Sequence, residues 1–222
     1  MLSFLRGHSL LLLLILAAVF TIVWLWLMRE RLSAKPYSLV LLAIVHVLYG
    51  VFTVKIFAFA EAGFDQSSAG NMSLFGAVFL MPPAYWLGAK LFKRDPRVVF
   101  DVFAVCMIFT LLCARCNCLI AGCCQGKLIP GSEARYPTRE IEIVFYLVLL
   151  EVLIYRLRKK KANGALYPIY MVSYGVLRFV LEFFRESDQL STLHRAHYWS
   201  ILSIVLGLLA LFILRKKTKK GA

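Results

Sequence analysis

Long apolar stretches constrain this chain more than any other feature. Hydrophobic residues occupy 61% of its 222 positions and charged residues only 17%, which is more apolar surface than a water-soluble domain of this size can bury. A membrane-spanning helix needs about 20 such residues. We therefore expect an all-α, polytopic integral membrane protein, with residues 1–222 forming a single transmembrane domain. Seven spans are predicted, at 9–28, 38–60, 74–92, 98–120, 141–157, 165–184 and 198–214.

Basic residues indicate how such a chain is oriented. Of its 26 Lys and Arg residues, 17 fall in four segments that border apolar stretches, at 29–35, 90–97, 156–161 and 215–220. The connections between them carry no such cluster, and 61–73 contains neither Lys nor Arg. Because basic loops stay on the cytoplasmic side, we expect the N-terminus outside and the C-terminus inside. This distribution favours contact with anionic lipid and argues against nucleic acid as a partner.

The first apolar stretch follows Arg6, which raises the alternative of a cleaved signal peptide. The stretch is longer than a signal core, and it ends in the charged residues 29–31 without an Ala-x-Ala site. We therefore expect it to remain as a helix.

Several ionisable residues lie inside the apolar stretches, where a charge near the helix centre costs at least about 2.5 kcal/mol. Such residues usually face the interior of a helix bundle or a wet cavity. We expect Lys55 to extend toward the membrane interface and His46 to hydrogen-bond between helices. The set is His46, Lys55, Arg115, Glu142, Glu151, Arg178 and Glu182.

The sixth predicted span carries an arginine-rich stripe. Its members Tyr174, Arg178, Glu182 and Arg185 recur at helical spacing on one face. Two guanidiniums against one carboxylate leave a positive charge, and the planar guanidinium binds two phosphate oxygens at once. With Arg115, the stripe can hold an anion near the outer headgroups. The alternative is an ion-pair network that only locks helices together.

All six cysteines fall between positions 106 and 124. Cys106 and Cys113 are expected to be small packing residues. For the other four we expect a disulfide that fastens the outer loop; a soft metal site and a reactive thiolate are the alternatives. Zinc sites usually use separated C-x₂₋₄-C pairs, which the adjacent Cys123 and Cys124 fit poorly. We therefore expect no bound metal, and we also expect no cofactor. The four are Cys116, Cys118, Cys123 and Cys124.

Three segments carry a family resemblance: 115–126 (RCNCLIAGCCQG), 137–142 (PTREIE) and 174–185 (YGVLRFVLEFFR). Their order and spacing, over about residues 70–188, resemble the prolipoprotein diacylglyceryl transferase family. That family has the signature G-R-x-G-N-F-x-N-x-E-x-x-G, then H-P-[ST]-Q-L-Y-E, then Y-G-x-x-R-F-x-x-E-x-x-R. The resemblance implies a multi-pass transferase of the bacterial cytoplasmic (inner) membrane. It would move diacylglycerol from phosphatidylglycerol to a cysteine thiol in a lipoprotein signal sequence, releasing glycerol phosphate.

The resemblance also implies roles for individual residues. Arg115 matches the signature arginine that meets the lipid phosphate. Glu142 closes the second motif, and the sixth-span stripe matches the third. The implied catalytic residues are Arg115, Arg178 and Glu182. The implied substrate-binding residues are Arg115, Arg178, Arg185, Tyr174 and Glu142.

Other positions depart from the family pattern. Phe75 stands where the family has a functional histidine, Cys118 replaces the signature asparagine, and Cys123 replaces the signature glutamate. The second motif keeps Pro137 but lacks the family's preceding histidine. Removing the proton of an acceptor thiol still requires a base. We expect His194 and His197, in the last outer connection, to be surface residues that do not replace the family's functional histidine.

Two other functions therefore stay open at this stage. A non-catalytic phospholipid-binding or anion-binding membrane protein would keep the arginines without the chemistry. A membrane thiol oxidoreductase would use a thiol site at Cys118, Cys123 and Cys124.

Overall fold

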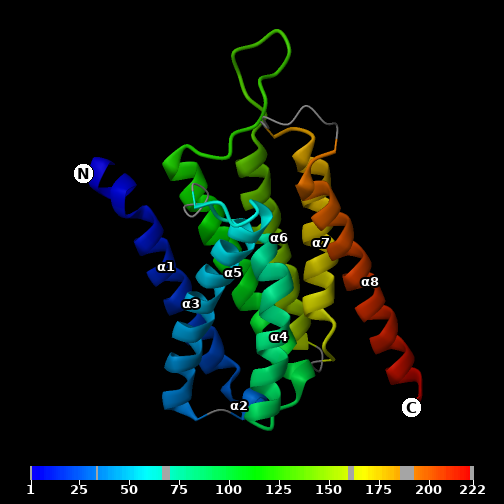
Figure 1. Ribbon diagram of the computed structural model, residues 1–222. Helices are drawn as coiled ribbons and strands as arrows, with labels where there is room; N and C mark the ends of the chain where they lie inside the picture. The colour runs from blue at the N-terminus through cyan, green and yellow to red at the C-terminus, as the bar shows by residue number, and fades with distance from the viewer. Residues whose placement is uncertain (1, 34, 67–70, 160–162, 186–192, 221–222) are drawn as a thin grey trace.

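Figure 1 shows the computed structural model of the chain, which describes residues 2–33, 35–66, 71–159, 163–185 and 193–220. The expected all-helical architecture is confirmed. The helices are α1 (Leu2–Leu27), α2 (Arg29–Leu32), α3 (Pro36–Glu61), α4 (Phe75–Leu91), α5 (Pro96–Ala121), α6 (Thr138–Lys159), α7 (Leu166–Glu182) and α8 (Arg195–Lys220).

Helix α5 is the centre of the bundle. It packs against α1, α4, α6 and α7, and 67% of its most apolar stretch is buried, against 22% in α1 and in α8. Local sequence sets both of its ends. The Asp95 carboxylate accepts a hydrogen bond from the Arg97 N–H at 2.9 Å, and Pro96 supplies a helical φ without needing a partner. At the other end Gly122 adopts φ 76°, a left-handed conformation that glycine takes without strain.

Among the described residues, four helices contain stretches long and apolar enough to cross a membrane. These are His8–Leu27 in α1, Tyr37–Glu61 in α3, Pro96–Ala121 in α5 and Arg195–Lys216 in α8. The shorter helices α4 and α7 have 17 residues each. Large apolar side chains on α1 and α8 are left open, as at Leu11 (57% exposed) and Phe212 (66% exposed). A surface of this kind fits lipid rather than water as the solvent.

The described parts of the first three basic segments (29–35, 90–97 and 156–161) lie at one end of the bundle, where α2 and the C-terminal ends of α4 and α6 are found (Figure 1). There the Arg31 Nη1 donates to the Leu157 carbonyl at 2.6 Å. The Asp101 side chain receives three backbone N–H bonds, from residues 163, 164 and 166, at 2.8–2.9 Å. Asp101, on α5, therefore caps the start of α7, a role that no local pattern predicted. Residues 160–161 of the third basic segment and 186–192 of the last outer connection lie outside the described residues.

The opposite end carries the long connection 122–137 between α5 and α6, which projects beyond the helices (Figure 1). It returns to α7 through an isolated bridge between Gly126 and Arg185. The Lys127 N–H donates to the Phe184 carbonyl at 2.8 Å. These contacts hold the connection against the end of α7, above the buried charges described next.

Candidate functional site

Four charged side chains from three helices form a continuous buried network. Arg115 on α5 places its Nε 2.9 Å from the Glu142 Oε2 on α6. The other oxygen of Glu142, Oε1, lies 3.4 Å from the Arg178 Nη1 on α7. Arg178 then reaches Glu182, one turn along α7, with Nη2 2.8 Å from Oε2. Two arginines that lie far apart in the sequence are thus joined through the one carboxylate they share.

Burial makes this network energetically important. The side chains of Glu142 and Arg115 are 1% and 5% exposed, and that of Arg178 is 7% exposed. Charges without water are stable only when each has partners of opposite sign. The Nε contact of Arg115 is an ion pair rather than an aligned hydrogen bond. The far end of its guanidinium is directed to the Cys118 Sγ, 4.0 Å from Nη1.

Aromatic residues surround the network. Phe75, at the start of α4, lies with its ring 6.0 Å from the Arg178 Cζ and packs edge-on against Tyr174 at 5.4 Å. Tyr174 is fully buried, and its hydroxyl has no hydrogen-bond partner among the described residues. The sequence analysis missed two further buried tyrosines whose hydroxyls are unpartnered in the same part of the chain, Tyr146 and Tyr170. Helical spacing could have identified them, because Tyr146 lies four residues after Glu142 and Tyr170 lies four residues before Tyr174.

Arg185 lies beyond the end of α7 and is only partly buried. Its guanidinium acts electrostatically on Tyr174 and on Cys124. The site therefore gathers three guanidiniums, of Arg115, Arg178 and Arg185, against the two carboxylates of Glu142 and Glu182. Within this set one positive charge is left over, at the end of the bundle opposite the basic segments.

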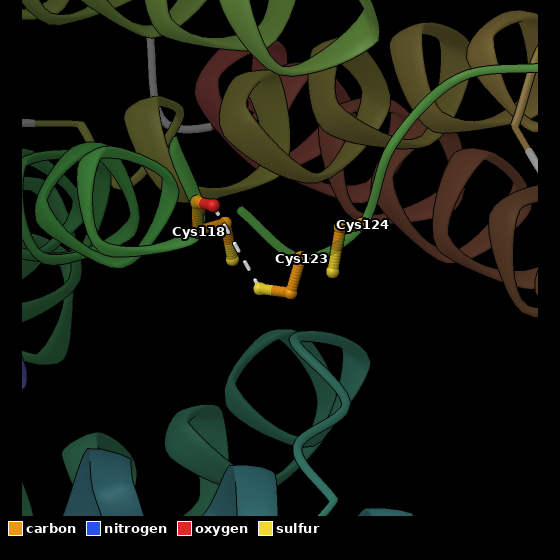
Figure 2. Close-up of side chains that lie close together, drawn as sticks. All are labelled: Cys118, Cys123 and Cys124. Atoms are coloured by element: carbon orange, nitrogen blue, oxygen red, sulfur yellow. Dashed lines mark hydrogen bonds between the residues drawn. The ribbon is translucent and has the colours of Figure 1, made fainter. Parts of the chain in front are cut away.

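The cysteines depart from the expectation. All six lie among the described residues and all six are free thiols, so the expected loop disulfide is wrong. Cys118, Cys123 and Cys124 instead gather with their sulfur atoms within 4.8 Å of one another, as Figure 2 shows. Three sulfurs that share one space do not approach as a single bonded pair. The packing role expected for Cys106 and Cys113 is confirmed, since both are buried in the apolar core.

The environment of Cys124 is electropositive. A hydrogen bond with the Cys118 thiol, helped by the charges of Arg185 and Arg115, lowers the pKa of Cys124 to about 4 despite partial burial. Arg139, at the start of α6, donates from Nη1 to the Cys123 carbonyl at 3.3 Å and so attaches this segment to α6. A thiolate in such surroundings can act as a nucleophile or as a metal ligand.

The histidines divide between two places. As expected, His46 bonds between helices, with its Nδ1 3.0 Å from the Tyr85 hydroxyl. The expectation of surface histidines at the last connection is wrong, because His194 and His197 are 7% and 0% exposed. His197 packs against Phe183 with ring centroids 4.5 Å apart, and it accepts the His194 N–H at Nδ1. Apolar packing at the start of α8 pulls both rings inward.

Two other ionisable residues lie away from the site. Lys55 is exposed, in keeping with the expectation that it extends outward. Glu151 is also exposed, so the expectation that it faces the interior is wrong. The reason is helical phase: Glu142 and Glu151 differ by nine positions, half a turn out of register on α6.

An apolar cavity of about 80 Å³ lies between α1, α3, α4 and α5. Gly50 and His46 of α3 line one side, and Cys113 and Ala114 of α5 line another. Ala114 directly precedes Arg115 in the sequence, so the cavity extends to the level of Arg115 along α5. An apolar space at the level of a positively charged side chain suits a ligand with a charged head and a hydrocarbon tail.

Comparison with known proteins gives a consistent result. The family model described as prolipoprotein diacylglyceryl transferase matches residues 8–213. The phosphatidylglycerol–prolipoprotein diacylglyceryl transferase of Dehalococcoides mccartyi is 24% identical over 231 residues, covering 93% of this chain and 88% of the relative. The enzyme of the same name from Mannheimia succiniciproducens is 32% identical over 168 residues, covering 69% of this chain and 63% of the relative.

Proposed function

Because the chain belongs to the prolipoprotein diacylglyceryl transferase family, we propose that it transfers a diacylglyceryl group from phosphatidylglycerol to the cysteine thiol of a prolipoprotein. The names of its curated relatives describe this reaction. The observation that carries the proposal is the buried network itself. Arg115 and Arg178, which lie at family-motif positions, share Glu142, and Arg178 also pairs with Glu182. Arg185 adds the positive charge that these two carboxylates do not balance.

In this proposal the guanidiniums of Arg115, Arg178 and Arg185 bind the lipid phosphate. Arginine suits this task because its fork pairs with two phosphate oxygens. Glu142 and Glu182 fix the orientation of Arg115 and Arg178, and Tyr174 offers its hydroxyl to the same headgroup. When the acceptor sulfur attacks the glycerol carbon, the C–O bond to phosphate breaks. The fixed guanidiniums then stabilise the charge that grows on the leaving phosphate.

The apolar cavity supplies the matching place for hydrocarbon. Its lining residues, from Gly50 on α3 to Ala114 on α5, are almost entirely apolar. We propose that it accepts part of an acyl chain while the headgroup lies against Arg115. Bound in this way, the reacting carbon is positioned next to the phosphate-binding arginines.

We further propose seven membrane spans in a bacterial cytoplasmic membrane, formed by α1 and by α3 to α8. The N-terminus lies outside and the C-terminus inside. The basic end of the bundle, near Arg31 and Asp101, supports a cytoplasmic location for that end by the positive-inside rule. The charge network then lies near the outer leaflet, where a prolipoprotein emerging from the membrane meets lipid headgroups.

The test is complementation in bacteria depleted of their own diacylglyceryl transferase, with the mass of a reporter lipoprotein as the readout. The wild-type chain should add one diacylglyceryl mass, and Arg115→Ala should abolish it. Arg158→Ala is the matched control, because Arg158 is exposed at the opposite end and should leave the mass shift unchanged. Full activity of Arg115→Ala in a membrane-inserted protein would contradict the proposed role of Arg115.

A further inference from the structure

Backbone geometry brings three cysteines together at the outer end of α5. The helix ends at Ala121, and Gly122 turns the chain back with φ 76°. The Cys123 N–H then bonds to the Cys118 carbonyl at 3.2 Å, and its thiol approaches the same carbonyl at 3.8 Å. The turn therefore brings Cys123 and Cys124 back beside Cys118. Their separation along the sequence does not reveal this proximity.

Cys124 adopts an unusual conformation within this turn. Its φ is 57°, in the left-handed region that residues other than glycine enter only at a cost. Figure 2 shows the three sulfur atoms facing the same space, and all three lie within 4.8 Å of one another. Strain of this kind is typical of functional positions, where the conformation places a side chain for a purpose.

The spacing of the sulfurs suits a metal ion better than a disulfide. Ligands at about 2.3 Å from a tetrahedral zinc ion stand about 3.8 Å apart. The observed upper limit of 4.8 Å thus requires only a small closure of flexible side chains. A disulfide would instead bring two sulfurs to about 2.05 Å and exclude the third.

Positive charge beside the cluster fits such a complex. Zn²⁺ with three thiolates carries one net negative charge, and it becomes more negative when a fourth thiolate binds. The Arg115 Nη1 lies 4.0 Å from the Cys118 Sγ, and the charge of Arg185 acts on Cys124. Both cations therefore offset the negative charge of a zinc–thiolate complex.

We propose that Cys118, Cys123 and Cys124 bind a zinc ion whose open fourth position takes the acceptor thiol of the prolipoprotein. Three protein ligands with one open position are typical of catalytic zinc. This inference rests on the proposed function and names the group that prepares its nucleophile. Phe75, buried against Tyr174 and Arg178, has no atom that can accept the thiol proton.

The reaction balances without another reagent. The acceptor thiol binds zinc and releases its proton to water, because a coordinating thiol is deprotonated. Its sulfur electron pair then forms an S–C bond with the glycerol carbon that carries the phosphate ester. The C–O bond breaks, and its electrons leave on glycerol phosphate beside Arg115. The thioether product is neutral and binds zinc weakly, so the fourth position reopens.

Metal binding is tested on the purified, reduced full-length chain in detergent. After chelation and removal of the chelator, Zn²⁺ is titrated against a chromophoric competitor. We expect one Zn²⁺ per chain, and affinity at least about tenfold weaker in Cys118→Ser, Cys123→Ser and Cys124→Ser. Cys116→Ser is the matched control, since Cys116 lies on the same helix outside the cluster. A folded wild-type chain that binds no Zn²⁺ would overturn the inference.

The open position is tested with Co²⁺ in place of zinc, because thiolate-to-cobalt absorption reports the number of sulfur ligands. A peptide with the acceptor cysteine should increase that absorption, and the same peptide with serine should not. Chelation should also stop diacylglyceryl transfer, and Zn²⁺ should restore it. Transfer that persists after complete chelation would overturn the inference while leaving the proposed function intact. Normal zinc binding without any transfer would instead contradict the proposed function.

Discussion

Replacing Glu142 by Gln tests the buried network at its most connected point. Glu142 lies 2.9 Å from the Arg115 Nε and 3.4 Å from the Arg178 Nη1, and its side chain is 1% exposed. Glutamine keeps nearly the same shape and one acceptor oxygen but removes the negative charge. Arg178 would then keep Glu182 as its carboxylate partner, and the buried Arg115 would lose the carboxylate that it contacts.

The expected cost follows from this geometry. Removing one partner of a buried ion pair costs about 3–5 kcal/mol, and the amide oxygen that the substituted glutamine retains places the loss near the lower limit. For a chain of this length, each kcal/mol shifts the unfolding temperature by roughly 2–4 °C. We therefore expect Glu142→Gln to unfold about 6–12 °C below the wild type.

Tryptophan fluorescence during heating in detergent measures this shift, since the chain has 4 Trp residues. Glu182→Gln is the matched control. Glu182 contacts only Arg178 in this network, and its side chain is 12% exposed, so its loss should cost less than half as much. Equal unfolding temperatures for the wild type and Glu142→Gln would refute the argument that Glu142 holds α5, α6 and α7 together.

Two further changes probe other parts of the molecule. Asp101→Ala leaves three N–H groups at the start of α7 without their acceptor, so we expect the free energy of unfolding to fall by about 3 kcal/mol. Asp101→Asn keeps one acceptor oxygen, and we expect it to lower the free energy of unfolding by about half as much. The unfolding temperatures of the two variants, measured by heating in detergent, compare these losses. Gly50→Leu should fold normally, since no described atom lies within 4 Å of an added Cβ, yet lower transfer by filling the cavity that Gly50 lines. Gly88→Leu, at an equally open position outside that cavity, is its control, and equal transfer rates in the two variants would count against acyl binding in the cavity.

Part of the candidate site was predictable from local spacing. Arg178 and Glu182 are four residues apart on one helix, and such pairs meet whenever the helix forms. Their ion pair at 2.8 Å is therefore a consequence of sequence alone. The partner of Arg115 was not predictable in this way, because α5 and α6 are separated by the connection 122–137 and only their packing brings Glu142 to Arg115.

The cysteines show the limit of spacing arguments more sharply. The adjacent pair Cys123 and Cys124 fits no standard zinc spacing, and a disulfide was the expectation. The clustering of the three thiols depends on two backbone angles, a left-handed φ at Gly122 and another at Cys124. Turn geometry of this kind is weakly coded in residue type, because several conformations of a short loop differ by only a few kcal/mol.

From residue order alone it follows that this chain is an apolar helical protein with basic segments at alternate connections, and that it carries the motifs of its family. Those properties follow from local causes: apolar length, charge placement and helical periodicity act without knowledge of the rest of the fold. Helix packing, in contrast, is what lets Arg115 and Arg178 share Glu142 and brings three free thiols beside a guanidinium. Such long-range contacts depend on how helices pack, where burial makes each charge require a partner that no local pattern specifies.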